Sequence, residues 1–118
     1  MSDNSSFSGT TILITRDGMG SADLVLQRKL LDTYLRLLME NDSLPAAICF
    51  YTYGVKLVVE GSPLLERLSQ LEHKGVRLIA CSTCLDYFGL SENVRVGIVG
   101  GMPDILEAQS RAGKVITL

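Results

Sequence analysis

The chain is short of the residues that build disulfide frameworks and metal sites: its 118 residues include three cysteines, one histidine and no tryptophan. A structural zinc site takes about four Cys or His ligands, and one C-x-x-C pair, one distant cysteine and His73 do not make up such a set. The apolar runs are too short to span a bilayer, and a chain of this length can build a core without disulfides. The sequence therefore predicts a globular domain with free thiols, no metal and no membrane partner.

The chain also has no large excess of positive or negative charge. The net charge is −2, the pI is about 5.3, and the eleven Lys and Arg residues are scattered, so we expect no surface for nucleic acid. The opening MSDNSSFSGT is polar and lacks the basic and apolar regions of a signal peptide. We expect a flexible leader over residues 1–9, a single domain over residues 10–118, and a cytoplasmic location in which thiols stay reduced.

Apolar periodicity indicates alternating strands and helices. β-branched apolar runs predict strands at 10–16, 45–51, 76–81, 94–99 and 114–118, and helical spacing predicts helices at 24–39, 63–74 and 103–112, with Ser21 and Ser62 as N-caps of the first two. Nearly continuous apolar strands between helices are typical of a parallel sheet covered on both faces. The fold class is therefore α/β, a three-layer α/β/α sandwich with a five-stranded parallel sheet.

Chemistry in such sheets gathers beyond the carboxyl ends of the strands. The expected strand ends lead into four loops to consider: DGMGS, TYGVK, CSTC and VGGMP. DGMGS is glycine-rich and precedes a helix, but it lacks the spacing of the known phosphate-binding loops, so a plain turn is the better interpretation.

The CSTC loop places two thiols at this edge. Cys81 ends the third predicted strand, and Cys84 follows near the start of a short helix that Thr83 can cap, with Asp86 three residues on in a capping-box position. A helix N-terminus lowers a thiol pKa. The pair fits a redox dithiol, half of a metal site, a sulfur-carrying thiol with a neighbour, or two buried residues. Cys49 lies inside a predicted strand, and we expect its side chain to pack in the core.

The TYGVK loop supplies the other candidates. Gly54 interrupts the apolar pattern after the second strand, and Lys56 falls on the same edge as the cysteines if the sheet is parallel. A lysine there favours a thiolate or a bound persulfide anion. His73, in the last turn of a helix, is expected to be structural.

Most of the chain resembles a known family. The segments ILITRDGMGSADLVLQRKLLDTYLRLL and FYTYGVKLVVEGSPLLERLSQLEHKGVRLIACSTCLDYFGL, with the closing KVITL, resemble the DsrE/DsrF-like family of sulfur-relay proteins. Within that family the chain is most similar to the C-terminal domain of YedF-type proteins, described as sulfurtransferase-like selenium metabolism proteins. The most specific piece is the run CSTCLD that closes on Gly89.

The resemblance implies a five-stranded α/β/α domain that assembles into dimers, trimers or hexamers. It implies that Cys81, aligned by the strand end and by Gly89, accepts sulfane sulfur as a persulfide, and that Cys84 resolves, shares or stays close to that sulfur. It implies no metal or organic cofactor. YedF proteins usually begin with a small sulfur-carrier domain bearing a cysteine-proline motif, which this chain lacks. The expected partner is therefore a separate carrier of that type.

The function expected from these observations is a sulfur carrier or sulfurtransferase that takes up sulfane sulfur, or selenium, and passes it to a partner. Two alternatives stay open. One is a non-catalytic oligomeric module that binds or regulates a partner and has inert thiols. The other is a thioredoxin-like redox dithiol, although the pair does not follow the first strand and lacks the expected aromatic and proline context.

Overall fold

The computed structural model describes residues 5–118, and its centre is a parallel sheet with strand order β4-β3-β2-β1-β5. The strands are β1 (Thr10–Ile14), β2 (Ala47–Phe50), β3 (Arg77–Cys81), β4 (Ile98–Gly100) and β5 (Lys114–Thr117). The predicted five-stranded parallel sheet is confirmed.

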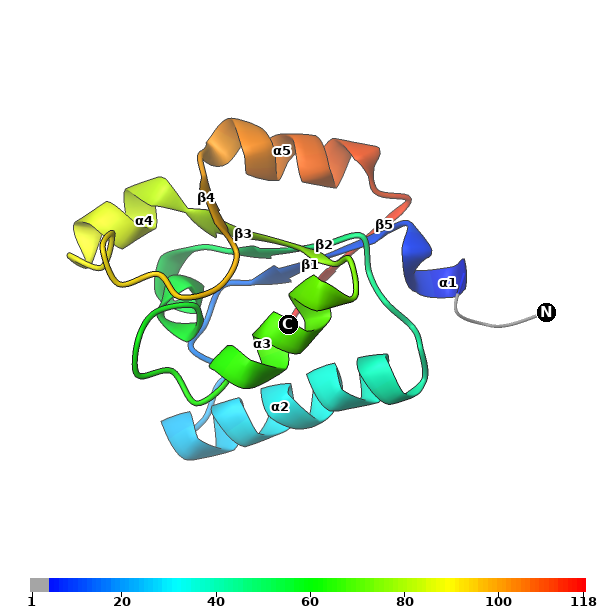
Figure 1. Ribbon diagram of the computed structural model, residues 1–118, viewed down its shortest axis with the longest axis horizontal. Coiled ribbons are helices and arrows are strands. Elements are labelled where there is room, and N and C mark those ends of the chain that lie inside the picture. The colour runs from blue at the N-terminus through cyan, green and yellow to red at the C-terminus, as the bar shows by residue number, and fades with distance from the viewer. Residues whose placement is uncertain (1–4) are drawn as a thin grey trace.

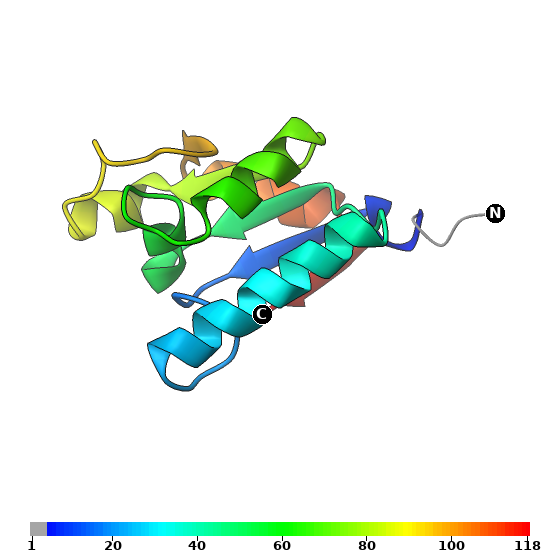
Figure 2. The same cartoon turned by 60° about the horizontal axis from the view of Figure 1, so that its bottom comes forward.

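Helices cover both faces of this sheet, as Figures 1 and 2 show. The helices are α1 (Ser5–Ser8), α2 (Leu24–Glu40), α3 (Leu65–His73), α4 (Ser82–Tyr87) and α5 (Met102–Arg111), with a 3-10 helix η1 (Thr52–Leu57). The chain steps from β1 through β2 and β3 to β4 in one direction and then returns to β5 on the other side of β1. Right-handed crossovers therefore place α2 and α3 on one face and α5 on the other. No helix within residues 5–118 is long and apolar enough to cross a membrane.

The core lies around the three central strands. Every residue of β1 and β2 is buried, and so is β3 from Leu78 to Cys81. The edge strands differ from the expectation of full burial, because Ile98 and Val99 of β4 are 53% and 52% exposed and Val115 of β5 is 43% exposed. An edge strand has a sheet neighbour on one side only, so an apolar run does not by itself guarantee burial.

The fourth strand is shorter than predicted. The sequence pattern predicts strand over 94–99, but β4 begins only at Ile98, and Val94 instead forms an isolated antiparallel bridge with Val59. Gly97 breaks the run: its φ is +81°, and a Cβ there would lie 3.0 Å from the Cβ of Leu78. A left-handed backbone cannot continue an extended strand.

Both predicted N-caps are wrong, although α2 begins at Leu24 as predicted. α2 is preceded by Asp23 rather than Ser21, and α3 begins at Leu65. The Ser62 hydroxyl accepts a hydrogen bond from the Leu64 N–H, which forms a turn before α3 and leaves the helix itself without a side-chain cap. Serine competes for backbone donors in turns as readily as at helix ends.

The expected leader is structured from residue 5 onward. Residues 1–4 lie outside the described part of the chain, while residues 5–8 form α1. Phe7 packs against the core, and the Lys114 ammonium group lies 5.0 Å from the centre of its ring. The Phe7 ring is what ties this segment to the domain.

One buried hydrogen bond ties α5 to the sheet: the Thr11 hydroxyl donates to the Ala108 carbonyl oxygen at 3.1 Å. We expect Thr11→Val, which keeps the shape of the side chain, to lower the free energy of unfolding by about 1–2 kcal/mol because the Ala108 carbonyl loses its buried partner. Urea unfolding measures this. Thr117→Val, at an exposed position of β5, is the matched control and should change stability little; equal effects of the two changes would contradict the prediction.

Candidate functional site

The two neighbouring cysteines lie at the carboxyl edge of the sheet, as predicted. Phe50 of β2 pairs with Ala80 of β3, so both strands end at the same level. Cys81 is the last residue of β3 and the N-cap of α4, and it is only 2% exposed. Cys84 lies in α4 and is half-buried. Both thiols are free, and Cys81 is a neighbour of Cys84 that helps to raise the pKa of the Cys84 thiol.

The backbone of Thr52 supplies a hydrogen bond to this pair. Its N–H donates to the Cys84 sulfur at 3.1 Å. Thr52 has a φ of +49°, a left-handed conformation that is a rare outlier for a β-branched residue. The Thr52 hydroxyl lies 2.6 Å from the Thr15 carbonyl oxygen and 2.7 Å from that of Tyr51, so the side chain holds the backbone in place. Strain of this kind clusters at functional sites.

Gly54 makes this turn possible. A Cβ on Gly54 would lie 2.0 Å from the Ile14 carbonyl oxygen, closer than any side chain tolerates. That same carbonyl accepts the N–H of Tyr51 at 3.2 Å, and the Gly54 N–H donates to the Tyr51 carbonyl at 3.0 Å. The chain therefore turns at once after β2 and packs η1 against the end of β1, where η1 contacts α4.

A largely aromatic pocket of about 370 Å³ opens beside Cys84. It is lined by Thr52, Tyr53, Thr83, Cys84, Tyr87 and Phe88. The Tyr53 and Phe88 rings stack with centroids 5.5 Å apart, and Tyr87 meets Phe88 edge-on at 5.4 Å. Cys81 does not line the pocket, so Cys84 is the thiol that a molecule in the pocket would meet.

Lys56 places one positive charge beside two of the aromatic rings that line this pocket. Its ammonium group lies 5.2 Å from the Tyr53 ring centre and 4.9 Å from that of Phe88. Such cation–π contacts hold a lysine in place while leaving its charge available. The expectation that Lys56 shares the cysteine edge is confirmed by this contact.

Burial governs the acidity of the thiols. Burial raises the pKa of the Cys84 thiol, the Thr52 N–H opposes that effect, and the neighbouring Cys81 adds to it, so the net direction is upward. The expected lowering by the helix N-terminus is outweighed, since α4 has only six residues. Burial raises the pKa of Cys49 to about 11. Cys49 is fully buried in β2, which confirms its expected packing role.

The structure corrects the roles of two predicted supporting residues. Thr83 lies inside α4 and lines the pocket, but it does not cap the helix, which has no side-chain cap. Cys81 already occupies the N-cap position, so Thr83 lies two residues too late for that role. Asp86 accepts a hydrogen bond from the Ser91 hydroxyl and therefore does not complete a capping box.

Thr52 and the three aromatic residues are the parts of the site that the sequence analysis did not single out. The available signal was the position of Thr52 and Tyr53 directly before Gly54, and of Tyr87 and Phe88 directly before Gly89. Of the other loops considered, DGMGS comes shortly after Thr15, whose carbonyl oxygen Thr52 contacts, and VGGMP leads into α5.

His73 is structural as expected, with its Nδ1 2.8 Å from the Ser69 carbonyl oxygen.

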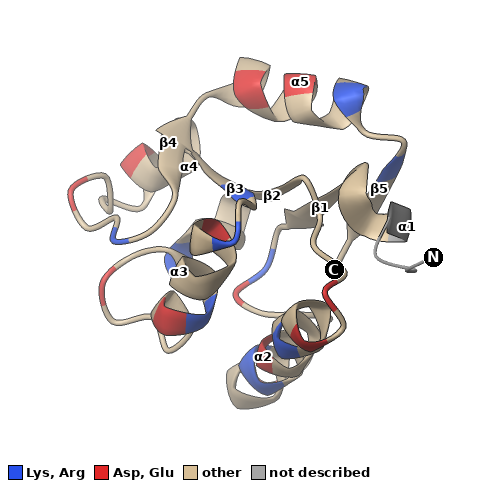
Figure 3. Ribbon diagram, turned by 45° about the vertical axis from the view of Figure 1, so that its right-hand side comes forward, with Lys and Arg blue, Asp and Glu red and all other residues tan. Residues whose placement is uncertain are grey.

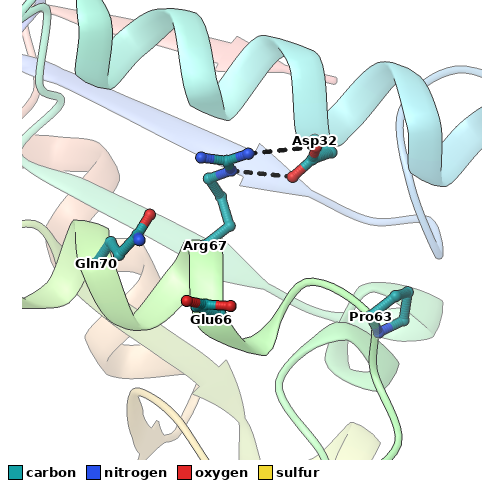
Figure 4. A pocket seen from close by; sticks show the side chains of 5 residues that line it. All are labelled: Asp32, Pro63, Glu66, Arg67 and Gln70. Atoms are coloured by element: carbon teal, nitrogen blue, oxygen red, sulfur yellow. Dashed lines mark hydrogen bonds and ion pairs between the residues drawn. The ribbon is translucent and has the colours of Figure 1, made fainter.

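A second hollow, of about 280 Å³, lies between α2 and α3 and is shown in Figure 4. The Arg67 guanidinium of α3 bonds the Asp32 carboxylate of α2 at 3.0 Å, so its charges already neutralise each other. Figure 3 shows acidic and basic residues interspersed along α2 and α3. Neither the hollow nor these helices presents a field of one sign for a charged ligand.

Comparison with known proteins identifies the family. The model of the DsrE/DsrF-like family matches residues 26–118. The chain belongs to the DsrE/DsrF-like family. This confirms the resemblance inferred from the CSTCLD run and its surroundings.

Solved structures share the fold of this DsrE-like chain at low identity. MTH1491, a protein of unknown function from Methanobacterium thermoautotrophicum, has a TM-score of 0.70 and 23% identity over 92% of this chain and 97% of its own. The ychN protein of E. coli has a TM-score of 0.69 and 20% identity, covering 94% and 99%. BT1422 of Bacteroides thetaiotaomicron, also of unknown function, has a TM-score of 0.68 and 20% identity over both whole chains. No curated protein matches the sequence.

The three thiols should react with iodoacetamide in an order set by burial. We expect Cys84 to be alkylated in the native protein and Cys49 only after unfolding, since Cys49 is fully buried with a pKa of about 11. Because the pKa of Cys84 is raised, its thiolate fraction should keep growing as the pH rises past the ordinary thiol range near 8.5. Peptide mapping at stepped pH measures both; a Cys84 rate that levels off below pH 8 would contradict the second point.

Gly54→Ala should disrupt the site. The added Cβ forces η1 away from the Ile14 carbonyl, at a cost of about 1–3 kcal/mol in the free energy of unfolding, and moves the Thr52 N–H away from Cys84. Gly113→Ala is the matched control, because its nearest neighbour would lie at an ordinary 3.9 Å. Urea unfolding and the Cys84 alkylation rate measure the two effects, and a Gly54→Ala protein as stable as the control would refute the account.

Proposed function

We propose that the protein is a sulfur carrier, which accepts sulfane sulfur as a persulfide on its Cys81–Cys84 pair and passes it to a partner. The observation that carries the proposal is the pair itself: two neighbouring free thiols at the carboxyl edge, one of them facing an open pocket and bonded by a backbone N–H. Membership of the DsrE/DsrF-like family supports a sulfur-relay role.

Sulfur transfer between thiols requires only an accessible thiolate. A thiolate attacks the outer sulfur of a donor persulfide, the donor S–S bond breaks, and the donor leaves as a thiolate while the new persulfide stays on the protein. Oxidation states are only exchanged between sulfur atoms, so the step is balanced without another reactant. Selenium in the outer position would follow the same path.

Lys56 and the pocket support this exchange. Both the departing donor thiolate and the persulfide anion carry negative charge, and the Lys56 ammonium beside the aromatic rings favours negative charge nearby. The rings of Tyr53, Tyr87 and Phe88 give one side of Cys84 a largely apolar surrounding. We infer that the recipient is a small sulfur-carrier protein in the reducing cytoplasm, and that the family's habit of assembling into oligomers extends to this chain.

The rival function is a binding module with inert thiols. The raised pKa of Cys84 favours it, because it lowers the fraction of Cys84 that is thiolate at neutral pH. The burial of Cys81 favours it as well, because a donor has little access to a side chain that is 2% exposed. Exposed apolar residues of β4 and α5 also offer a contact surface: Ile98, Val99, Met102 and Leu106 are 52–62% exposed.

Intact-protein mass spectrometry after incubation with glutathione persulfide separates the two functions. The carrier predicts that the wild type gains the mass of one sulfur atom, that a thiol reductant removes it, and that the double variant Cys81→Ser/Cys84→Ser gains nothing. The double variant retains Cys49 and so controls for nonspecific sulfur uptake. Absence of an adduct on folded wild type would leave the binding module as the function.

A further inference from the structure

Deepening the proposed function, on which this inference rests, we propose that Cys84 rather than Cys81 is the thiol that receives sulfur from the donor, and that Thr52 is its positioning residue. The assignment of Cys81 as acceptor rests on the family resemblance alone. In the structure the two thiols differ in access and in hydrogen bonding, and both differences favour Cys84.

Access is the first difference. A donor persulfide must bring its outer sulfur into line with the attacking sulfur, which requires an open approach. Cys81 is 2% exposed and closes β3, whereas Cys84 is half-buried and forms part of the wall of the 370 Å³ pocket. A donor that occupies this pocket reaches Cys84 without any movement of the sheet, while it reaches Cys81 only past Cys84 or after the edge opens.

The Thr52 N–H is the second difference. It lies 3.1 Å from the Cys84 sulfur and opposes the rise in pKa that burial causes. The Thr52 N–H belongs to the Tyr51–Thr52 peptide, whose direction is set by the extended backbone of Tyr51 (φ −146°, ψ 170°). The Thr52 hydroxyl contacts the carbonyl oxygen of that same peptide and the carbonyl oxygen of Thr15. These contacts, with the strained left-handed φ of +49° at Thr52, hold the peptide in place with its N–H on the sulfur.

The Cys84 thiolate attacks the outer sulfur of a donor R–S–SH, a Cys84–S–SH group forms, and R–S⁻ leaves toward Lys56. One S–S bond forms and one breaks, and no proton or electron is left over. Cys81 is the neighbouring thiol that raises the pKa of Cys84 in the unloaded protein.

Initial loading rates test the order of the thiols. Wild type, Cys81→Ser and Cys84→Ser are mixed briefly with glutathione persulfide, and the adduct is located by peptide mapping. We expect Cys81→Ser to load at close to the wild-type rate on Cys84, and Cys84→Ser to load about tenfold or more slowly. The reverse pattern, or equal rates, overturns this inference but leaves the carrier function standing; no loading of any protein overturns both.

Thr52 variants test the positioning role in the Cys81→Ser background. Thr52→Val keeps the branched shape but loses the hydroxyl anchors, so its backbone relaxes and the N–H leaves the sulfur. Loading should slow about three- to tenfold, because the thiolate loses a hydrogen bond that stabilises it. The loss is partly offset because a more basic thiol is a better nucleophile. The pH profile of Cys84 alkylation should shift upward. Thr52→Ser keeps the hydroxyl and should restore both values.

A merely structural role for Thr52 would give a different outcome. In that case Thr52→Val would lower stability without moving the pH profile, or Thr52→Ser and Thr52→Val would behave alike, and either result overturns the positioning role. Because Thr52 is exposed, both variants should fold, and circular dichroism with urea unfolding checks that they do.

Discussion

The close approach of Gly54 to the Ile14 carbonyl oxygen is the constraint on which the site depends. That carbonyl ends β1 and also accepts the N–H of Tyr51, so the chain leaving β2 is held against its neighbouring strand and must turn immediately. The turn forces Thr52 into left-handed backbone space and directs its N–H toward α4. The packing of the chain against β1 therefore positions the Thr52 N–H to donate to the Cys84 sulfur. Only a glycine at position 54 leaves room for this close approach.

The same fold gives its three cysteines different chemistry through their distance from the sheet edge. Cys49 lies within β2, where desolvation holds the pKa far above that of a free thiol. Cys81 lies where β3 becomes α4, buried but neighbouring Cys84. Cys84 is three residues farther on and faces a pocket. Composition alone would count three equivalent thiols, whereas position along the chain separates a packing residue from a pair at the carboxyl edge of the sheet.

Much of this arrangement was predictable from the sequence, and the remainder has identifiable physical reasons. Continuous apolar runs predict the five strands, and the end of one of them places the C-x-x-C pair at the carboxyl edge. The early end of the fourth strand was missed because it depends on the backbone conformation of Gly97 against Leu78. The Thr52 contact was missed because a threonine at positive φ has no sequence signature, and because its partner lies thirty-two residues away. The capping role given to Thr83 failed because the strand runs directly into α4, with Cys81 at the junction.

The raised pKa of Cys84 is compatible with a carrier, because carriage requires both uptake and release. Uptake uses the thiolate as nucleophile, and nucleophilicity increases with pKa, which partly offsets the smaller thiolate fraction. Release makes the same sulfur a leaving group when the next carrier attacks the outer sulfur, and a leaving thiolate departs faster when its pKa is lower. Burial and the Thr52 N–H act in opposite directions on this one pKa. Under the proposed carrier function, the N–H would stabilise the negative charge that Cys84 bears at the start of uptake and regains at the end of release, so that one backbone donor would serve transfer in both directions.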